Sequence, residues 1–147
     1  MKAVGPAVGI AALMLAGGAL LSGCTEVQSA SSESGYQPAE VTEAGGGKLD
    51  VVFTADGAAR VGLQRATAVT VEGQTVVPYA ALIYDGQGLP WVYTALEDLT
   101  FRRVQVAVDR IDGDRVFLSS GLPAGTRVVT VGAAEVYGTE LGISGGH

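Results

Sequence analysis

The sequence is poor in the side chains that build metal sites and activated nucleophiles. It holds one cysteine (Cys24), one histidine (His147) and two methionines (Met1 and Met14). Soft metals need thiolate or thioether ligands, and zinc needs thiolate or imidazole ligands. His147 ends a glycine-rich tail, where a general base would have no fixed position. We therefore predict no metal site, no cofactor and no catalytic residue, and we expect the protein not to be an enzyme.

Basic side chains are scarce as well. The chain has 9 Lys and Arg against 15 Asp and Glu, which gives a formal net charge of −6. An acidic protein repels both a nucleic-acid backbone and anionic lipid head groups. This balance argues against nucleic acid as a partner and against electrostatic docking on a membrane surface.

Charge is absent altogether from residues 4–23, an apolar stretch that follows Lys2. A positive start, an apolar run and small residues before a cleavage point are the parts of a secretory signal. The LSG tripeptide at 21–23, directly before Cys24, resembles the bacterial lipobox, whose cysteine is acylated and becomes the first residue after cleavage. The resemblance implies a signal peptide at 1–23, lipid attachment at Cys24 and a place on the extracytoplasmic (periplasmic) side of the cell membrane. An uncleaved transmembrane anchor is the alternative, since about 20 apolar residues can span a bilayer.

Large apolar side chains are nearly missing from residues 24–48, which are rich in serine, glutamate and glycine. Such a composition cannot bury a core, so we predict a lipidated, disordered tether there. Residues 49–142 are then the folded part, and about 95 residues suffice for one small core but not for two. A disordered tail is predicted at 143–147.

Residues 49–142 have the pattern of short β-strands. Valine, threonine and aromatic residues recur in brief runs separated by glycine, aspartate and proline, and no helix-period segment of 10–12 residues is present. Tight turns are predicted at 85–88 (DGQG) and 112–114 (DGD). We predict an all-β fold, a small β-sandwich or split barrel of about seven short strands, in which one face of each strand is core and the other meets solvent. Phe101 is out of phase with the valines that follow it, which predicts a β-bulge at Arg102 and Arg103.

The stretch from Val76 to Gly142 resembles the C-terminal part of the periplasmic adaptor subunits (membrane fusion proteins) of resistance-nodulation-division efflux systems. The resemblance rests on VPYAALIYD, WVYT and GLPAGTRVVTVGAAEVYG. Residues 51–69 resemble a segment near the adaptor N-terminus. In adaptors these two segments form the membrane-proximal domain, a small β-structure beside the inner-membrane pump.

A full adaptor carries a β-barrel domain, a lipoyl-like domain and a long helical hairpin between the two segments. Here only Thr70–Val76 (TVEGQTV) joins them. The resemblance therefore implies a stand-alone membrane-proximal domain whose two segments pair with each other, and which does not bridge the envelope.

Three functions follow from this resemblance. The first is an accessory or adaptor-like lipoprotein, anchored to the membrane by its lipid, that binds an inner-membrane efflux transporter or a full-length adaptor. The alternative is a solute- or lipid-binding lipoprotein module that reuses the fold, which a buried apolar cavity would favour. The third is a truncated relic without a partner.

Five side chains are the predicted partner contacts: Tyr84, Trp91, Tyr93, Arg102 and Arg103. Aromatic and arginine side chains are enriched in binding hot spots, and two adjacent arginines are unusual in so acidic a chain. The competing interpretation is that the aromatics are ordinary core and that the arginines keep an edge strand soluble. On the contact hypothesis, reversing both arginine charges removes the partner and leaves thermal stability nearly unchanged.

Overall fold

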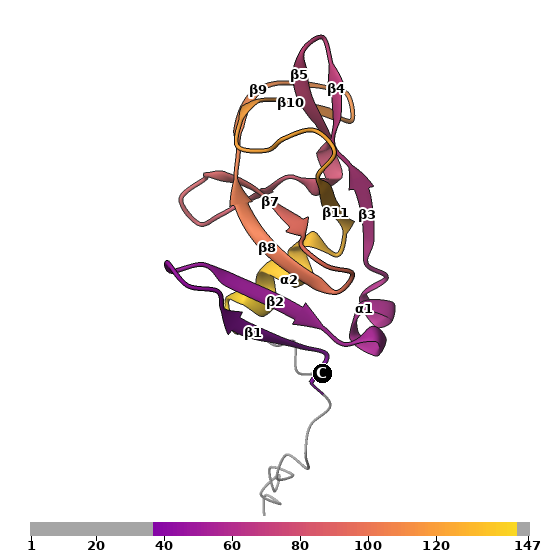
Figure 1. The fold of residues 1–147 in the computed structure, drawn as a ribbon, viewed down its shortest axis with the longest axis vertical. Helices are drawn as coiled ribbons and strands as arrows, with labels where there is room; N and C mark the ends of the chain where they lie inside the picture. The colour runs from indigo at the N-terminus through magenta and orange to yellow at the C-terminus, as the bar shows by residue number, and fades with distance from the viewer. Residues whose placement is uncertain (1–36, 144–147) are drawn as a thin grey trace, which may run out of the picture. The chain divides into compact units, whose positions relative to one another are not determined.

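The computed structural model describes residues 37–143, which form two β-sheets and two short α-helices (Figure 1). The larger sheet has the strand order β1-β2-β8-β7-β11-β3, with β6 paired to β7, and the smaller sheet has the order β4-β5-β10-β9. In chain order the elements are β1 (Ala39–Glu43), β2 (Leu49–Phe53), α1 (Ala55–Val61), β3 (Gln64–Thr67), β4 (Val69–Val71), β5 (Gln74–Pro78), the 3-10 turn η1 (Tyr79–Ala81), β6 (Ile83–Tyr84), β7 (Pro90–Ala95), β8 (Thr100–Gln105), β9 (Ala107–Asp112), β10 (Arg115–Ser120), β11 (Arg127–Val131) and α2 (Ala133–Glu140).

The all-β prediction is confirmed, and the two sheets do not close into a barrel. The described residues hold eleven strands rather than about seven, because some valine runs contain an unrecognised turn. Thr70–Val76 is such a run: it reverses direction at Glu72 and Gly73, whose φ angles of 53° and 79° produce the β4–β5 hairpin. Positive φ at both turn residues is the geometry of the tight hairpin turns that match the twist of a sheet.

The predicted signal peptide 1–23 and the predicted lipid attachment at Cys24 lie outside the described residues, as does the tail from residue 144. Within residues 37–143, neither helix has the length or the apolar character that crossing a bilayer would need.

The predicted tether is corrected at its C-terminal end. Residues 39–43 are not disordered but form β1, which pairs antiparallel with β2 from Ala39 opposite Phe53 to Glu43 opposite Leu49. Four of the five β1 side chains are exposed, so the strand carries almost no hydrophobic signal in its sequence. Backbone pairing holds it in place, together with the Pro38 carbonyl, which accepts hydrogen bonds from the N–H (3.0 Å) and hydroxyl (3.2 Å) of Thr54.

Two strands of the larger sheet, β7 and β11, are buried on both faces, which corrects the expectation of one solvent face for them. In β7, Val92 faces a core shared with the smaller sheet, and the next residue, Tyr93, faces a second core that includes Val136 of α2. In β11, Val128 faces the core shared with the smaller sheet, and Val129 faces the second core. Figure 1 shows the arrangement, with the smaller sheet above the larger one and α2 passing behind β2 and β8.

The segments before and after Thr70–Val76 pair with each other, as predicted. β2 pairs with β8, with Asp50 opposite Arg102, and β3 pairs with β11, with Thr67 opposite Arg127. The β7–β8 register runs without a shift, so the predicted bulge at Arg102 and Arg103 is wrong. Phe101 is out of phase with the valines because it faces the core under α2, whereas Val104 packs against the core shared with the smaller sheet.

Candidate functional site

A hollow of about 360 Å³ lies beside β8, at the place where β2 begins. The pairing of β2 with β8 ends at Arg102, so among the described residues no strand pairs with residues 103–105 on that side. Side chains from both faces of β8 can therefore reach the same space. The lining residues are Gly47, Lys48, Leu49, Trp91, Arg102, Arg103, Val104, Gln105 and Glu140.

Arg102 is held in one orientation at the hollow by Asp50. Its Nε and Nη2 atoms donate to the two carboxylate oxygens of Asp50 at 2.6 and 2.8 Å, the bidentate geometry in which a guanidinium matches a carboxylate. The Asp50 hydrogen bond raises the pKa of Arg102 further above its already high value, which favours the cation. The pair joins the opposed residues of β2 and β8.

Arg103 joins the sheet to α2 on the opposite face of β8. Its guanidinium lies 3.0 Å from the Glu140 carboxylate and sits over the rings of Trp91 (4.4 Å to the centroid) and Tyr137 (5.3 Å). The hydroxyl of Tyr93 donates a hydrogen bond to the same carboxylate. Burial is the main cause that raises the pKa of Tyr93, and this hydrogen bond is the second. The phenol therefore keeps the proton that it donates. Glu140 thus receives two partners while its side chain is only 5% exposed.

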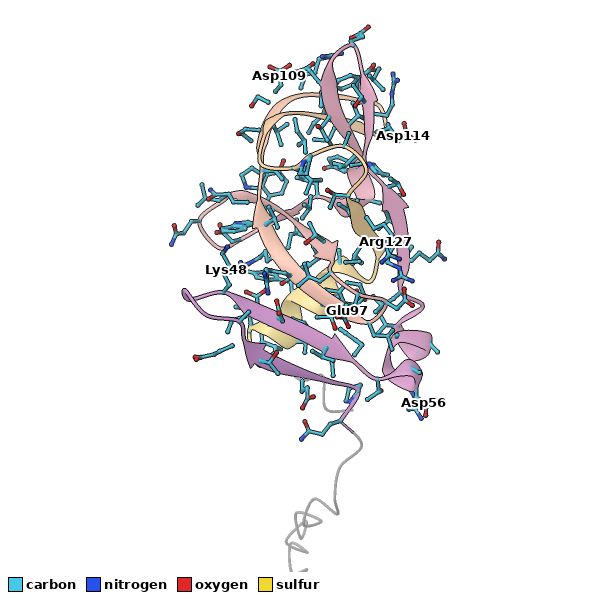
Figure 2. All side chains as sticks on the ribbon, viewed as in Figure 1. Lys48, Asp56, Glu97, Asp109, Asp114 and Arg127 are labelled. Atoms are coloured by element: carbon cyan, nitrogen blue, oxygen red, sulfur yellow. The ribbon has the colours of Figure 1, made fainter. Side chains whose placement is uncertain are left out.

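Lys48 supplies a third cation at the hollow. It stands at the end of the β1–β2 turn, beside β8, as Figure 2 shows. Its side chain is exposed and has no ion pair with the part of the chain that the structure describes. Asp50 and Glu140 pair with the two arginines, so Lys48 is the lining cation that has no ion pair among residues 37–143.

The structure brings together three of the five predicted contacts, Trp91, Arg102 and Arg103, in the lining of the hollow. Tyr84 lies on β6, half exposed, and is not part of the lining. Tyr93 is fully buried, so for this residue the core interpretation holds and the prediction of a surface contact is wrong.

The structure bears on both interpretations of the two arginines. β8 lies between β2 and β7, and Arg102 is opposite Asp50 of β2, so Arg102 does not protect an edge; Arg103 lies just beyond the part of β8 that β2 covers. Reversing their charges would place each new carboxylate against Asp50 or Glu140, whose side chains are 15% and 5% exposed. From these contacts we expect the double charge reversal to lower the stability of the protein, because like charges at short range in a half-buried site repel strongly.

Three residues of the site were not predicted from the sequence: Lys48, Asp50 and Glu140. Lys48 was assigned to the tether, and Asp50 is 52 residues from its partner Arg102, so no local pattern joins them. Glu140 ends a helix of which only Ala133 and Val136 are buried, and this helix lacks the apolar stripe that would have predicted it.

Asp85 fixes the indole of Trp91 at the rim of the site. Its carboxylate accepts hydrogen bonds from the backbone N–H groups of Gln87 and Leu89 (2.9 Å each) and from Nε1 of Trp91 (3.0 Å). The bond from the N–H of Leu89, followed by those from Gln87 and Trp91, lowers the pKa of Asp85 below its ordinary value. The predicted turn at 85–88 is thus present, closed by a side chain that also orients the aromatic wall of the hollow.

The acidic turn at 112–114 has a structural role and is a hairpin tip, as predicted. Asp109 accepts a hydrogen bond from Gln74 and Asp112 pairs with Arg115, and Figure 2 shows Asp109 and Asp114 at the smaller sheet, away from Lys48. Among residues 37–143 there is no group of three or more histidine, cysteine, aspartate or glutamate side chains placed to hold a metal ion.

Residues 74–135 match a family model described as the C-terminal permuted SH3 domain of the membrane fusion proteins (MFPs) of resistance-nodulation-division (RND) systems. The matched stretch runs from β5 into α2 and covers somewhat less than half of the chain. The resemblance of residues 51–69 lies outside the match and stays a prediction. No curated protein matches the chain. Residues 74–135 are thus a C-terminal domain of the RND membrane fusion protein type.

Proposed function

We propose that the protein is a membrane-anchored, extracytoplasmic lipoprotein that acts as an adaptor-like binding subunit of an efflux transporter. The observation that carries this proposal is the match of residues 74–135 to the adaptor-type domain. In this proposal the lipid on Cys24 holds the protein on the membrane, and the domain binds an inner-membrane transporter or a full-length adaptor.

The β6–β7 hairpin is the surface that best fits such a contact. Tyr84 is 50% exposed and Leu89 is 39% exposed, and Tyr84 stands opposite Pro90 in the pairing of the two strands. Exposed apolar side chains gathered on one turn lose contact with water when a partner docks, and tyrosine is among the residues that most often dominate such interfaces.

The test is recovery of the partner from detergent-solubilised membranes, with mass spectrometry of the retained proteins. We expect the wild-type chain to retain an inner-membrane transporter or a full-length adaptor. Tyr84→Ala should lower the recovery roughly tenfold, the effect of removing a hot-spot side chain. Tyr79→Ala is the matched control, because Tyr79 is also 50% exposed but belongs to η1. Equal recovery by the two variants would show that the hairpin is not the contact, and recovery of neither class of protein would overturn the proposed function.

Anchoring is tested separately with Cys24→Ala. A thioether-linked lipid cannot form on alanine, so we expect loss of incorporation of labelled fatty acid and release of the protein from washed membranes, or accumulation of the unprocessed chain. Serine at residue 22 offers a control, since Ser22→Ala keeps both the cysteine and a small residue before it. A Cys24→Ala protein with unchanged processed mass and unchanged membrane attachment would contradict the lipoprotein assignment.

A further inference from the structure

We propose that the hollow beside β8 binds a small amphiphilic monoanion, a molecule with one carboxylate on an apolar body. This inference does not depend on the proposed transport function, and the lining of the hollow does not include Tyr84 or Leu89. It rests on the charge of the hollow, on its lining and on the rigidity of its walls.

The charge of the hollow selects an anion. Lys48 has no carboxylate partner among the described residues, and the bonds of Arg102 to Asp50 use Nε and Nη2, which leaves Nη1 for a further acceptor. A carboxylate between these two groups would receive charge-assisted hydrogen bonds, which are shorter and stronger than neutral ones. Lys48 is the one lining cation without an ion pair among residues 37–143, and Asp50, Glu140 and Asp85 lie close by, so a ligand with a single carboxylate fits the site better than a polyanion.

The lining selects an apolar body behind the carboxylate. Leu49, Trp91 and Val104 border the hollow, and each is partly exposed to water. An apolar group placed against them would remove this surface from water, which is favourable in proportion to the area covered. The volume of about 360 Å³ lies at the lower end of the range of roughly 300–1,000 Å³ that is usual for small-molecule sites.

The walls are fixed before any ligand binds. Asp50 holds Arg102, Glu140 holds Arg103, and Asp85 holds the indole of Trp91. Ligand binding then orders few side chains, which reduces its entropic cost. The hollow also combines Trp91 and the two arginines from the matched segment with Lys48, Leu49 and Glu140 from outside it, so the matched segment alone does not form it.

The chain has one tryptophan, and it borders the hollow, so its fluorescence reports on the site directly. The experiment titrates the full chain, in nanodiscs of zwitterionic lipid, with octanoate, octylammonium and octanol, which share one chain length and differ in charge. We expect a saturable change of Trp91 emission with octanoate, and an affinity at least about tenfold higher than that for octanol, since a hydrogen bond to a charged group contributes on this scale. Octylammonium should bind more weakly still.

Lys48→Ala should weaken octanoate binding about tenfold and leave octanol binding unchanged. Lys48 is exposed and has no ion pair among the described residues, so this variant should keep its thermal midpoint, and Lys48→Arg should retain binding. Arg115→Ala is the control, because Arg115 is an exposed cation paired with Asp112 on the smaller sheet.

Equal affinities for octanoate and octanol, or wild-type affinity in Lys48→Ala, would overturn the inference. Tighter binding of a tetraglutamate peptide than of octanoate would also overturn it, in favour of an acidic protein segment. The assay contains no partner protein, so its failure is distinct from a failure to recover a transporter.

Discussion

Replacing Glu140 by alanine is expected to lower the free energy of unfolding by about 2–4 kcal/mol. The substitution leaves the guanidinium of Arg103, 24% exposed, without its carboxylate, and it leaves the fully buried hydroxyl of Tyr93 without its acceptor. Removing one partner of a buried ion pair costs about 3–5 kcal/mol, and residual contact of Arg103 with water reduces that cost. Urea unfolding followed by Trp91 fluorescence measures the difference.

Two further variants separate the ion pair from a general effect on α2. Glu135→Ala is made on the same helix, at an exposed position in the first turn, and should cost less than about 1 kcal/mol, the usual contribution of an acidic residue near a helix N-terminus. Glu140→Gln keeps an acceptor for Tyr93 but removes the charge facing Arg103, so its loss should fall between the other two. If Glu135→Ala and Glu140→Ala were equally destabilising, Glu140 would not be what holds α2 on the sheet.

Gly57→Ala is expected to destabilise the protein by about 2–3 kcal/mol, although alanine is the better helix former. Gly57 is buried in the first turn of α1, and a Cβ atom there would overlap the carbonyl oxygen of Pro38. The backbone at Pro38 would have to move away, and its two hydrogen bonds from Thr54 would be lost. Since Pro38 immediately precedes β1, the variant should also expose the β1–β2 hairpin to limited proteolysis.

Gly138→Ala provides the matched control for the second helix. A Cβ atom at residue 138 would make only an ordinary contact, 3.7 Å from the carbonyl oxygen of Ile143. Helix propensity should therefore dominate, and the variant should be up to about 1 kcal/mol more stable than the wild type. Opposite signs for the two glycine variants, measured by urea unfolding, identify the close approach to Pro38 as the cause. A Gly57→Ala protein as stable as Gly138→Ala would show that Pro38 adapts without cost.

The local part of the fold was predictable from the sequence. The turns at 85–88 and 112–114 combine aspartate and glycine between valine-rich runs, and both form hairpins. β1 was not predictable, since its sequence AEVTE has no buried face and the strand exists through backbone pairing with β2. The double burial of β7 was not predictable either, because its second face is covered by α2, a helix with little amphipathic character.

The candidate site could be predicted only in part, for a related reason. The aromatic and arginine residues of β7 and β8 stand out by type, and three of them do line the hollow. Their charge partners cannot be recognised by type, since aspartate and glutamate are common in this chain. Asp50 and Glu140 lie 52 and 37 residues along the chain from Arg102 and Arg103, and only the three-dimensional pairing of β2, β8 and α2 brings them together.

The strand order of the larger sheet also determines when this protein can fold. β3, near the start of the domain, has β11 as its strand partner, and β2 pairs across the sheet with β8. A ribosome delivers these strands tens of residues apart, and contacts between distant parts of a chain form slowly because a long loop must first close. The β1–β2 and β4–β5 hairpins are local, but the larger sheet cannot be completed until residue 131 has been synthesised. The topology thus delays completion of the larger sheet until nearly all of the described domain has been synthesised.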